Sequence, residues 1–328
     1  MKLFQPNNLS KRSPEFNPVH DQTIVSVLAE RYALAPWRVS VFEGANVSSQ
    51  NFKVETASHA WFLKAREASL AEKMLAEARL TFALSELGQR VPRIVPSRDD
   101  ELVTVSEERC WVLYEFQEGD YFTGEGSEME AAAKTFAGLS LAAQQLFSPA
   151  EFAEDVVPRG LDELLDRGRS ASSSVGTLCA THGEMILHQL QLVDELPTQP
   201  VAPMHLDYHP LNLLMNEGRV ACVVDLEHLK PYPVVAGLGF AAFKLIRQAM
   251  VDKELRDAVP LWLRAWEKYF PEHRFTVTAL GLGARARILK LIYLILDASL
   301  NRGDNRSTYD LEKQIVSLYE ADVIFGEL

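Results

Sequence analysis

The stretch MHLDYHPLNLLMNEGRVACVVDLEH, residues 204–228, decides how the rest of this 328-residue chain is interpreted. Apolar, strand-like runs surround its few polar residues, and the MNEG segment at 215–218 is typical of a hairpin turn. Asp207 and Asn212 are five residues apart, and Asp225 follows thirteen residues later at the end of an apolar run. A hairpin here would return Asp225 to Asn212, so a carboxylate and an amide oxygen would converge.

This set of side chains suits phosphoryl-transfer chemistry. Carboxylate and amide oxygens are hard ligands that suit Mg²⁺, which is usually held by one or two protein groups while phosphates and waters complete its shell. In phosphoryl transfer the protein mainly positions the reactants, and an aspartate orients the attacking hydroxyl and takes its proton. Asp207, a few residues upstream of the hairpin, fits that role.

The same stretch resembles the aminoglycoside phosphotransferase and choline kinase-like enzymes, which are relatives of the protein kinases. Their catalytic segment has the pattern H-G-D-x-H-P-x-N, followed downstream by D-x-E. Residues 205–212 here are HLDYHPLN and residues 225–227 are DLE. Leu206 stands where the family usually has Gly, a change that removes no ligand.

The resemblance implies an enzyme, a phosphotransferase that uses ATP and Mg²⁺ and takes an alcohol group as acceptor. It implies Asp207 as the catalytic residue and Asn212 and Asp225 as metal ligands. It also implies an α+β, two-lobed protein-kinase-like fold. In that fold a small antiparallel β-sheet lobe carries one helix, and a larger lobe is mainly helical.

The N-terminal part contains the residues that such a nucleotide lobe needs. AWFLKARE, residues 60–67, places Lys64 near the end of a strand, where a family kinase carries the lysine that holds the nucleotide phosphates. Glu77 follows thirteen residues later on the intervening helix and is expected to pair with Lys64, with Glu72 as the second choice. The strand 111–116 resembles the family's hinge.

The resemblance implies that backbone groups of Glu115, Phe116 and Gln117 contact the adenine. The loop expected to cover the phosphates, EGANVSSQN at 43–51, has a single glycine, so Ser48 and Ser49 are expected to help to cradle phosphate. A second departure from the family is VVAGLGFAA at 234–242, which lacks an aspartate often found there.

The pattern along the chain separates a β-rich part from a helical part near Gln117. We expect a nucleotide-binding lobe at 1–117, with 1–20 as a loose leader, and a catalytic and acceptor-binding lobe at 118–328. The expected elements of the first part are strands at 39–42, 51–56, 60–65, 102–105 and 110–116 and helices at 21–33 and 70–87. The expected helices of the second part are 131–146, 161–166, 175–196, 240–250, 260–269, 284–300 and one from 307.

The composition limits the possible partners. Lys plus Arg number 33 and Asp plus Glu 45, giving a formal charge of −12 that argues against nucleic acid and favours, weakly, a cationic small-molecule acceptor. Apolar runs are too short for a membrane span, so no membrane association is expected. Three dispersed cysteines favour the cytoplasm, and no protein partner is evident.

Three other functions remain open at this point. A metal-dependent hydrolase would use His205, Asp207 and His209, which occupy alternate positions like zinc ligands on a strand. A nucleotide-binding pseudokinase would keep the fold without the reaction. A protein kinase is disfavoured because no A-P-E follows Asp225.

The aromatic residues at 262, 266 and 269 have helical spacing and are expected in the core rather than at a substrate.

Overall fold

The computed structural model describes most of the chain, namely residues 16–19, 21–42, 49–106, 108–125, 127–147, 156–171, 173–194, 196, 200–249, 258–302 and 307–326. The described residues form two compact units, which we call the sheet unit (16–123 and 210–227) and the helical unit (124–209 and 228–328). The lobe boundary near Gln117 stays a prediction. The segment 210–227 packs within the sheet unit, although it follows that boundary in the sequence.

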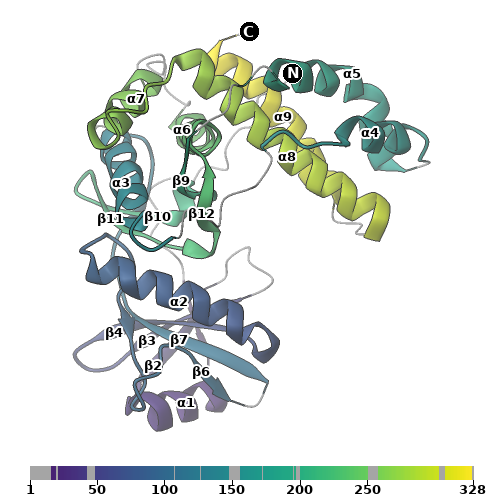
Figure 1. The fold of residues 1–328 in the computed structure, drawn as a ribbon. Helices are drawn as coiled ribbons and strands as arrows, with labels where there is room; N and C mark the ends of the chain where they lie inside the picture. Colours follow the sequence, from purple (N-terminus) through teal and green to yellow (C-terminus); the bar gives the residue numbers. More distant parts are fainter. Residues whose placement is uncertain are drawn as a thin grey trace. The chain divides into compact units, whose positions relative to one another are not determined.

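A seven-stranded sheet forms the centre of the sheet unit, in the order β1-β2-β3-β4-β7-β5, with β6 also paired to β7 (Figure 1). All of these pairs are antiparallel, as the sequence predicted. The strands are β1 (Phe16–Val19), β2 (Arg38–Phe42), β3 (Gln50–Glu55), β4 (Ala60–Glu67), β5 (Ile94–Val95), β6 (Thr104–Ser106) and β7 (Arg109–Glu115).

Strand β1 corrects one expectation. Residues 16–19 were placed in a loose leader, but they pair antiparallel with β2, and Pro18 lies opposite Ser40. A proline cannot donate to a strand ladder, which made a strand hard to predict there. At the edge of the sheet, where β1 lies, one side of the strand needs no donor, so proline is tolerated.

Two helices cover opposite faces of this sheet (Figure 1). Helix α1 (Gln22–Tyr32) packs on the face that carries Leu63 and Leu113. Helix α2 (Ala71–Glu86) packs on the other face, where Ala78 meets Val112. Because side chains alternate along a strand, Lys64 and the other even-numbered residues of β4 project toward α2.

The predicted hairpin is present in the sheet unit. Strands β10 (Leu213–Asn216) and β11 (Arg219–Val223) pair antiparallel, and β10 also pairs with β8 (Asp120–Tyr121). Glu217 and Gly218 between them both have positive φ, 49° and 72°, as the favoured two-residue hairpin turn requires.

The helical unit contains α3 (Glu128–Ala143), α4 (Leu161–Arg169), α5 (Ser174–Asp194), α6 (Val234–Ala249), α7 (Ala258–Tyr269), α8 (Val277–Arg302) and α9 (Ser307–Phe325). Strand β9 (Val201–His205) pairs antiparallel with β12 (Leu229–Pro233). The prediction missed β12 and began α6 six residues too late. Most of the first residues of α6 are buried, so they show no polar face from which a helical period could be recognised.

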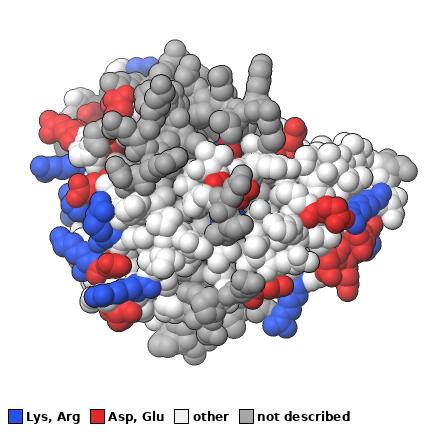
Figure 2. All heavy atoms as spheres, turned by 90° about the horizontal axis from the view of Figure 1, so that it is seen from above, with Lys and Arg blue, Asp and Glu red and all other residues white. Residues whose placement is uncertain are grey.

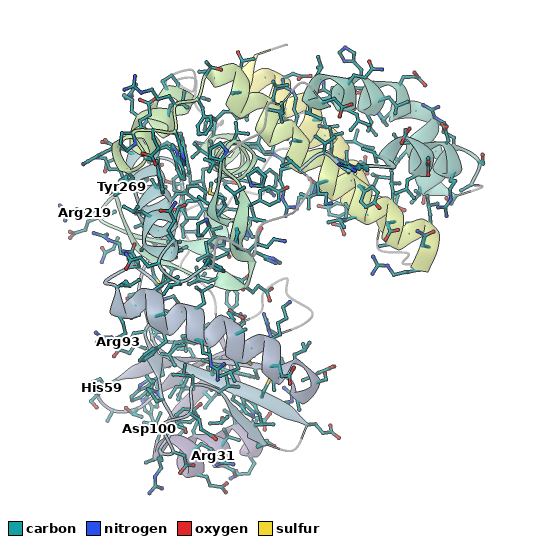
Figure 3. The ribbon with its side chains drawn as sticks, viewed as in Figure 1. Arg31, His59, Arg93, Asp100, Arg219 and Tyr269 are labelled. Carbon is teal, nitrogen blue, oxygen red and sulfur yellow. The ribbon has the colours of Figure 1, made fainter. Side chains whose placement is uncertain are left out.

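Charged side chains are mixed on the surface. On the face drawn in Figure 2, basic and acidic groups lie among one another toward the edges. Arg31, His59 and Arg93 lie at the periphery of the sheet unit (Figure 3). Within the described ranges, none of the helices has the length and apolar character that a membrane span needs.

Candidate active site

Lys64 is held between two carboxylates in the sheet unit. Its Nζ lies 2.9 Å from Oε1 of Glu77 on α2 and 3.3 Å from Oδ1 of Asp225, which follows β11. Lys64 and Glu77 are both 7% exposed, so this ion pair is shielded from solvent. The predicted pairing of Lys64 with Glu77 is therefore present, and Asp225 joins it from 161 residues away.

Arg66 extends this network, and the sequence analysis did not identify it. Its Nη1 lies 3.4 Å from Oε2 of Glu77, and its Nη2 lies 3.0 Å from Oε2 of Glu227. Lys73 Nζ lies 3.2 Å from the same Glu227 oxygen. The available signal was the spacing: Arg66 is two residues after Lys64, hence on the same face of β4.

The charges around Glu227 act on its ionisation. Partial burial raises the pKa of Glu227, but the Arg66 charge and a hydrogen bond from Lys73 outweigh burial and hold that pKa below its usual value. Glu227 is therefore ionised at neutral pH. It ties the D-x-E segment to β4 and α2 through Arg66 and Lys73.

The hairpin brings the predicted metal ligands onto adjacent segments. The backbone N–H of Val224 donates to the carbonyl oxygen of Asn212 at 3.0 Å, and Asp225 is the next residue. Asn212 is 7% exposed. Asp225 has a φ of 62°, a left-handed conformation that is uncommon for a non-glycine residue and is often found at functional sites. A carboxylate and an amide on neighbouring segments fit the oxygen ligands that Mg²⁺ prefers.

The end of the predicted phosphate loop carries polar atoms without partners. Ser48 lies outside the described residues. Oγ of Ser49 and Oδ1 of Asn51 are buried and, among the residues described, have no hydrogen-bond partner. Asn51 lies opposite Lys64 in the β3–β4 pair. Leaving such atoms unpaired is costly, so a ligand that bonds to them would be favoured.

The expected hinge follows β7. The backbone N–H of Glu115 donates to Arg93 at 2.9 Å, and that of Phe116 donates to Ala60 at 3.3 Å. An adenine contact through either N–H would have to replace an existing hydrogen bond. The adenine contacts of Glu115, Phe116 and Gln117 stay a prediction.

Asp207 belongs to the helical unit and follows β9. Oδ2 of Asp207 lies 3.4 Å from Nε2 of His209, and its backbone N–H donates to Nδ1 of His205 at 3.3 Å. Burial has the largest single effect and raises the pKa of Asp207. The hydrogen bond and charge of His209, followed by the charge of Lys244, outweigh it and lower that pKa to about 2. Asp207 is thus a carboxylate at neutral pH.

The backbone around Asp207 is anchored by hydrogen bonds and aromatic packing. The hydroxyl of buried Tyr208 donates to the carbonyl of Ala132 at 2.9 Å, and its ring centroid lies 4.9 Å from that of Phe136. The N–H of Leu206 donates to His228 at 3.1 Å.

The aromatic residues of α7 belong mainly to the core, as expected. Trp262 and Trp266 are each 1% exposed. Tyr269 lies beside α3, where its ring faces Gly138 (Figure 3). These contacts make the side chains part of the α3–α7 packing.

The alternative zinc site is not supported by the arrangement of these residues. In the portion of the chain that the structure describes, no three His, Cys, Asp or Glu side chains are grouped to hold a metal ion. His205 is 2% exposed and its Nδ1 accepts from the Asp207 backbone, so it holds the local chain conformation.

Comparison with known proteins gives one family and a set of similar folds. The model of the phosphotransferase enzyme family matches residues 41–274, more than half of the chain. No curated protein sequence matches the chain.

Several solved structures share the fold at low sequence identity. A spectinomycin phosphotransferase, solved with ADP and spectinomycin, is 14% identical with a TM-score of 0.65, over 93% of this chain and 99% of that one. An amicoumacin kinase, solved with AMP-PNP and Ca²⁺, is 13% identical with a TM-score of 0.63, over 94% and 95%. A microcompartment-associated aminopropanol kinase is 17% identical with a TM-score of 0.59, over 92% and 95%.

Proposed function

Because this chain belongs to the phosphotransferase enzyme family, we propose that it transfers the γ-phosphoryl group of ATP to a hydroxyl of a small acceptor. The observation that carries this proposal is the position of Lys64, whose ammonium lies within 3.3 Å of both the Glu77 and Asp225 carboxylates. A buried cation next to a candidate metal ligand suits the phosphates of a nucleotide. The kinase neighbours solved with ADP or AMP-PNP agree with this choice of ligand.

The sheet unit would bind the nucleotide. Glu77 fixes the Lys64 side chain, so the ammonium is oriented toward phosphate before the nucleotide arrives. Asn212 and Asp225 would hold Mg²⁺, which when bound neutralises charge on the phosphates. Oγ of Ser49 and Oδ1 of Asn51, which have no hydrogen-bond partner among the described residues, would supply further polar contacts at the end of the loop.

Asp207 would act on the acceptor. As an ionised carboxylate it orients the acceptor hydroxyl and takes its proton while the new oxygen–phosphorus bond forms. The bond between the γ-phosphorus and the bridging oxygen breaks, and ADP leaves. His205 and Tyr208 keep the backbone of Asp207 in place through the hydrogen bonds described above.

The acceptor belongs to the range of small hydroxyl compounds. Structural neighbours include an aminopropanol kinase and a spectinomycin phosphotransferase, so amino alcohols and aminosugars are the first compounds to test. The net charge of −12 also favours a cationic acceptor by long-range attraction. The proposed location is the cytoplasm, where the three free cysteines would stay reduced.

Nucleotide binding tests the proposal. Calorimetry should detect binding of Mg-ATP that weakens when EDTA removes the metal. Asp225→Asn should bind Mg-ATP about tenfold more weakly, or weaker still, because it removes a charged metal ligand and with it the metal-dependent part of the affinity. Asp100→Asn is a matched control, since Asp100 also has a left-handed φ, 59° against 62°, in the same unit. The proposal fails if Mg-ATP does not bind or if both variants bind it as the wild type does.

A further inference from the structure

A group of basic side chains surrounds Lys244 in the helical unit, and the charge of Lys244 acts on Asp207. This basic cluster consists of Lys244 and Arg247 on α6, Arg287 on α8 and Lys313 on α9. The charges of the other three members all act on Lys244, as does the opposite charge of Asp207. The cluster is notable because the chain as a whole is acidic.

The packing of α6 explains why Lys244 is close to Asp207. A Cβ on Gly237 would meet the Met204 side chain at 2.8 Å, so α6 lies directly against β9, the strand that leads to Asp207. Lys244 is seven residues after Gly237, which is two turns along the same face of the helix. The same face of α6 thus contacts β9 and presents Lys244.

The packing of α6 on α8 brings in Arg287. A Cβ on Gly239 would meet the Leu280 carbonyl oxygen at 2.3 Å, so the two helices approach closely. The Lys244 Nζ lies 5.1 Å from the ring centroid of Phe240, and the Arg287 guanidinium lies 5.9 Å from the same centroid. Arg287 also lies 5.4 Å from the Tyr232 ring. Two cations therefore share one aromatic ring.

Only part of the cluster is neutralised by acidic side chains. Arg247 pairs with Glu320 at 2.7 Å. Lys244 and Arg287 have no hydrogen bond or ion pair to any residue that the structure describes, and the Arg287 Nε atom is buried. Burial first, then the charges of Lys313, Arg247 and Arg287, lower the pKa of Lys244 to about 8, so it is still mainly protonated at pH 7. Cations held together in this way usually have an anionic partner.

We propose that the basic cluster, through Lys244 and Arg287, binds an anionic group of the acceptor, a carboxylate or a phosphate ester, while Asp207 receives the acceptor's hydroxyl. The inference rests on the proposed function. A guanidinium and an ammonium are the usual protein ligands for both anions. In the proposed function Lys64 of the sheet unit binds the nucleotide phosphates. The basic cluster is therefore not needed for the nucleotide and can bind the acceptor.

Local charges near Asp207 affect the choice of acceptor more than the net charge of the chain does. The charge of −12 is a sum over the whole chain, and salt screens such charges beyond about 8 Å. Charges close to Asp207 act most strongly on a bound acceptor, and Lys244 is a positive group whose charge reaches Asp207. A hydroxy acid, a hydroxy amino acid or a phosphorylated alcohol satisfies the local charges, whereas a purely cationic amino alcohol would be repelled.

Calorimetry on protein saturated with Mg-ADP tests the inference. The titrants are compounds that carry an anionic group and counterparts that lack it: zwitterionic L-serine against ethanolamine, and D-glycerate or glycerol 3-phosphate against glycerol. At least one anionic compound should bind about tenfold more tightly than its counterpart. Lys244→Met should weaken that binding about tenfold and leave Mg-ADP affinity unchanged. Lys268→Met, which removes an exposed lysine of α7, should change neither.

The outcomes separate this inference from the proposed function. Failure of Mg-ADP to bind would count against the proposed function. If Mg-ADP binds normally, three results would overturn the inference but not the proposed function. These are that no compound with an anionic group binds, that the counterparts bind as tightly, or that Lys244→Met binds the compound with the anionic group as the wild type does. Denaturant unfolding of Lys244→Met should show no large loss of stability, because Lys244 makes no direct ion pair with a described residue and is surrounded by like charges.

Discussion

At the scale of single residues, β4 carries two buried basic side chains, Lys64 and Arg66, and the sequence pattern predicts a role only for the first. Lys64 was predicted because its neighbourhood resembles a known motif. Arg66 was not, although it bridges Glu77 and Glu227 at 3.4 and 3.0 Å. Alternation along a strand places both residues on one face, but only the packing of α2 and of residues 210–227 supplies the two carboxylates that Arg66 meets.

Arg66→Met should destabilise the protein by about 2–4 kcal/mol, because it leaves the carboxylates of Glu77 and Glu227 buried with less compensating charge. Arg93→Met is the control: Arg93 is 68% exposed and pairs with Glu115 at 3.7 Å, so its loss should cost less than about 1 kcal/mol. The free energies of unfolding in urea give both values. Equal losses for the two variants would show that the Arg66 network contributes no more than a surface ion pair.

At the scale of elements, the sequence predicted helices and strands best where one face of the element is more buried than the other. The strands that became β2, β3, β4 and β7 alternate between the α1 and α2 faces, and the hairpin at 213–223 has a diagnostic turn. The strand β1 was missed because Pro18 argues against a ladder, and the start of α6 because its residues are buried on all sides. Lys64 and Asp225 are brought together by packing between segments far apart in the chain, which no local sequence pattern indicates.

Two helical glycines should respond in opposite ways to alanine. Gly239→Ala places a Cβ 2.3 Å from the Leu280 carbonyl oxygen, so α6 and α8 must separate, at a cost of about 1–3 kcal/mol. Gly138→Ala meets the Tyr269 ring at an ordinary 3.7 Å, and alanine favours the helix, so stability should rise by about 0.5–1 kcal/mol. Thermal or urea unfolding measures the difference. A stabilising Gly239→Ala would mean that α6 and α8 are not closely packed there.

At the scale of the whole molecule, the proposed site residues are distributed over both compact units. The sheet unit contains Lys64, Glu77, Asn212 and Asp225, and the helical unit contains Asp207. The motif was recognisable in the sequence because these residues cluster at 205–227, and the fold class followed from the family that the motif resembles. The roles of the individual residues, and the contribution of Ser48, remain predictions.

Product analysis shows whether the protein transfers the γ-phosphoryl group of ATP to an acceptor. The protein is incubated with Mg-ATP and a panel of amino alcohols, aminoglycosides, hydroxy acids and sugars, and mass spectrometry measures the phosphorylated acceptor. Asp162→Asn, on the exposed first turn of α4, serves as the control for Asp207→Asn.

We expect one acceptor to gain a single phosphoryl group, with an equal amount of ADP formed. Asp207→Asn should lower kcat by about a hundredfold or more, while Asp162→Asn matches the wild type. Equal rates for Asp207→Asn and the wild type would show that Asp207 is not the catalytic residue. Mg-ATP turnover without any phosphorylated acceptor across the panel would show that the protein does not transfer the phosphoryl group to such an acceptor.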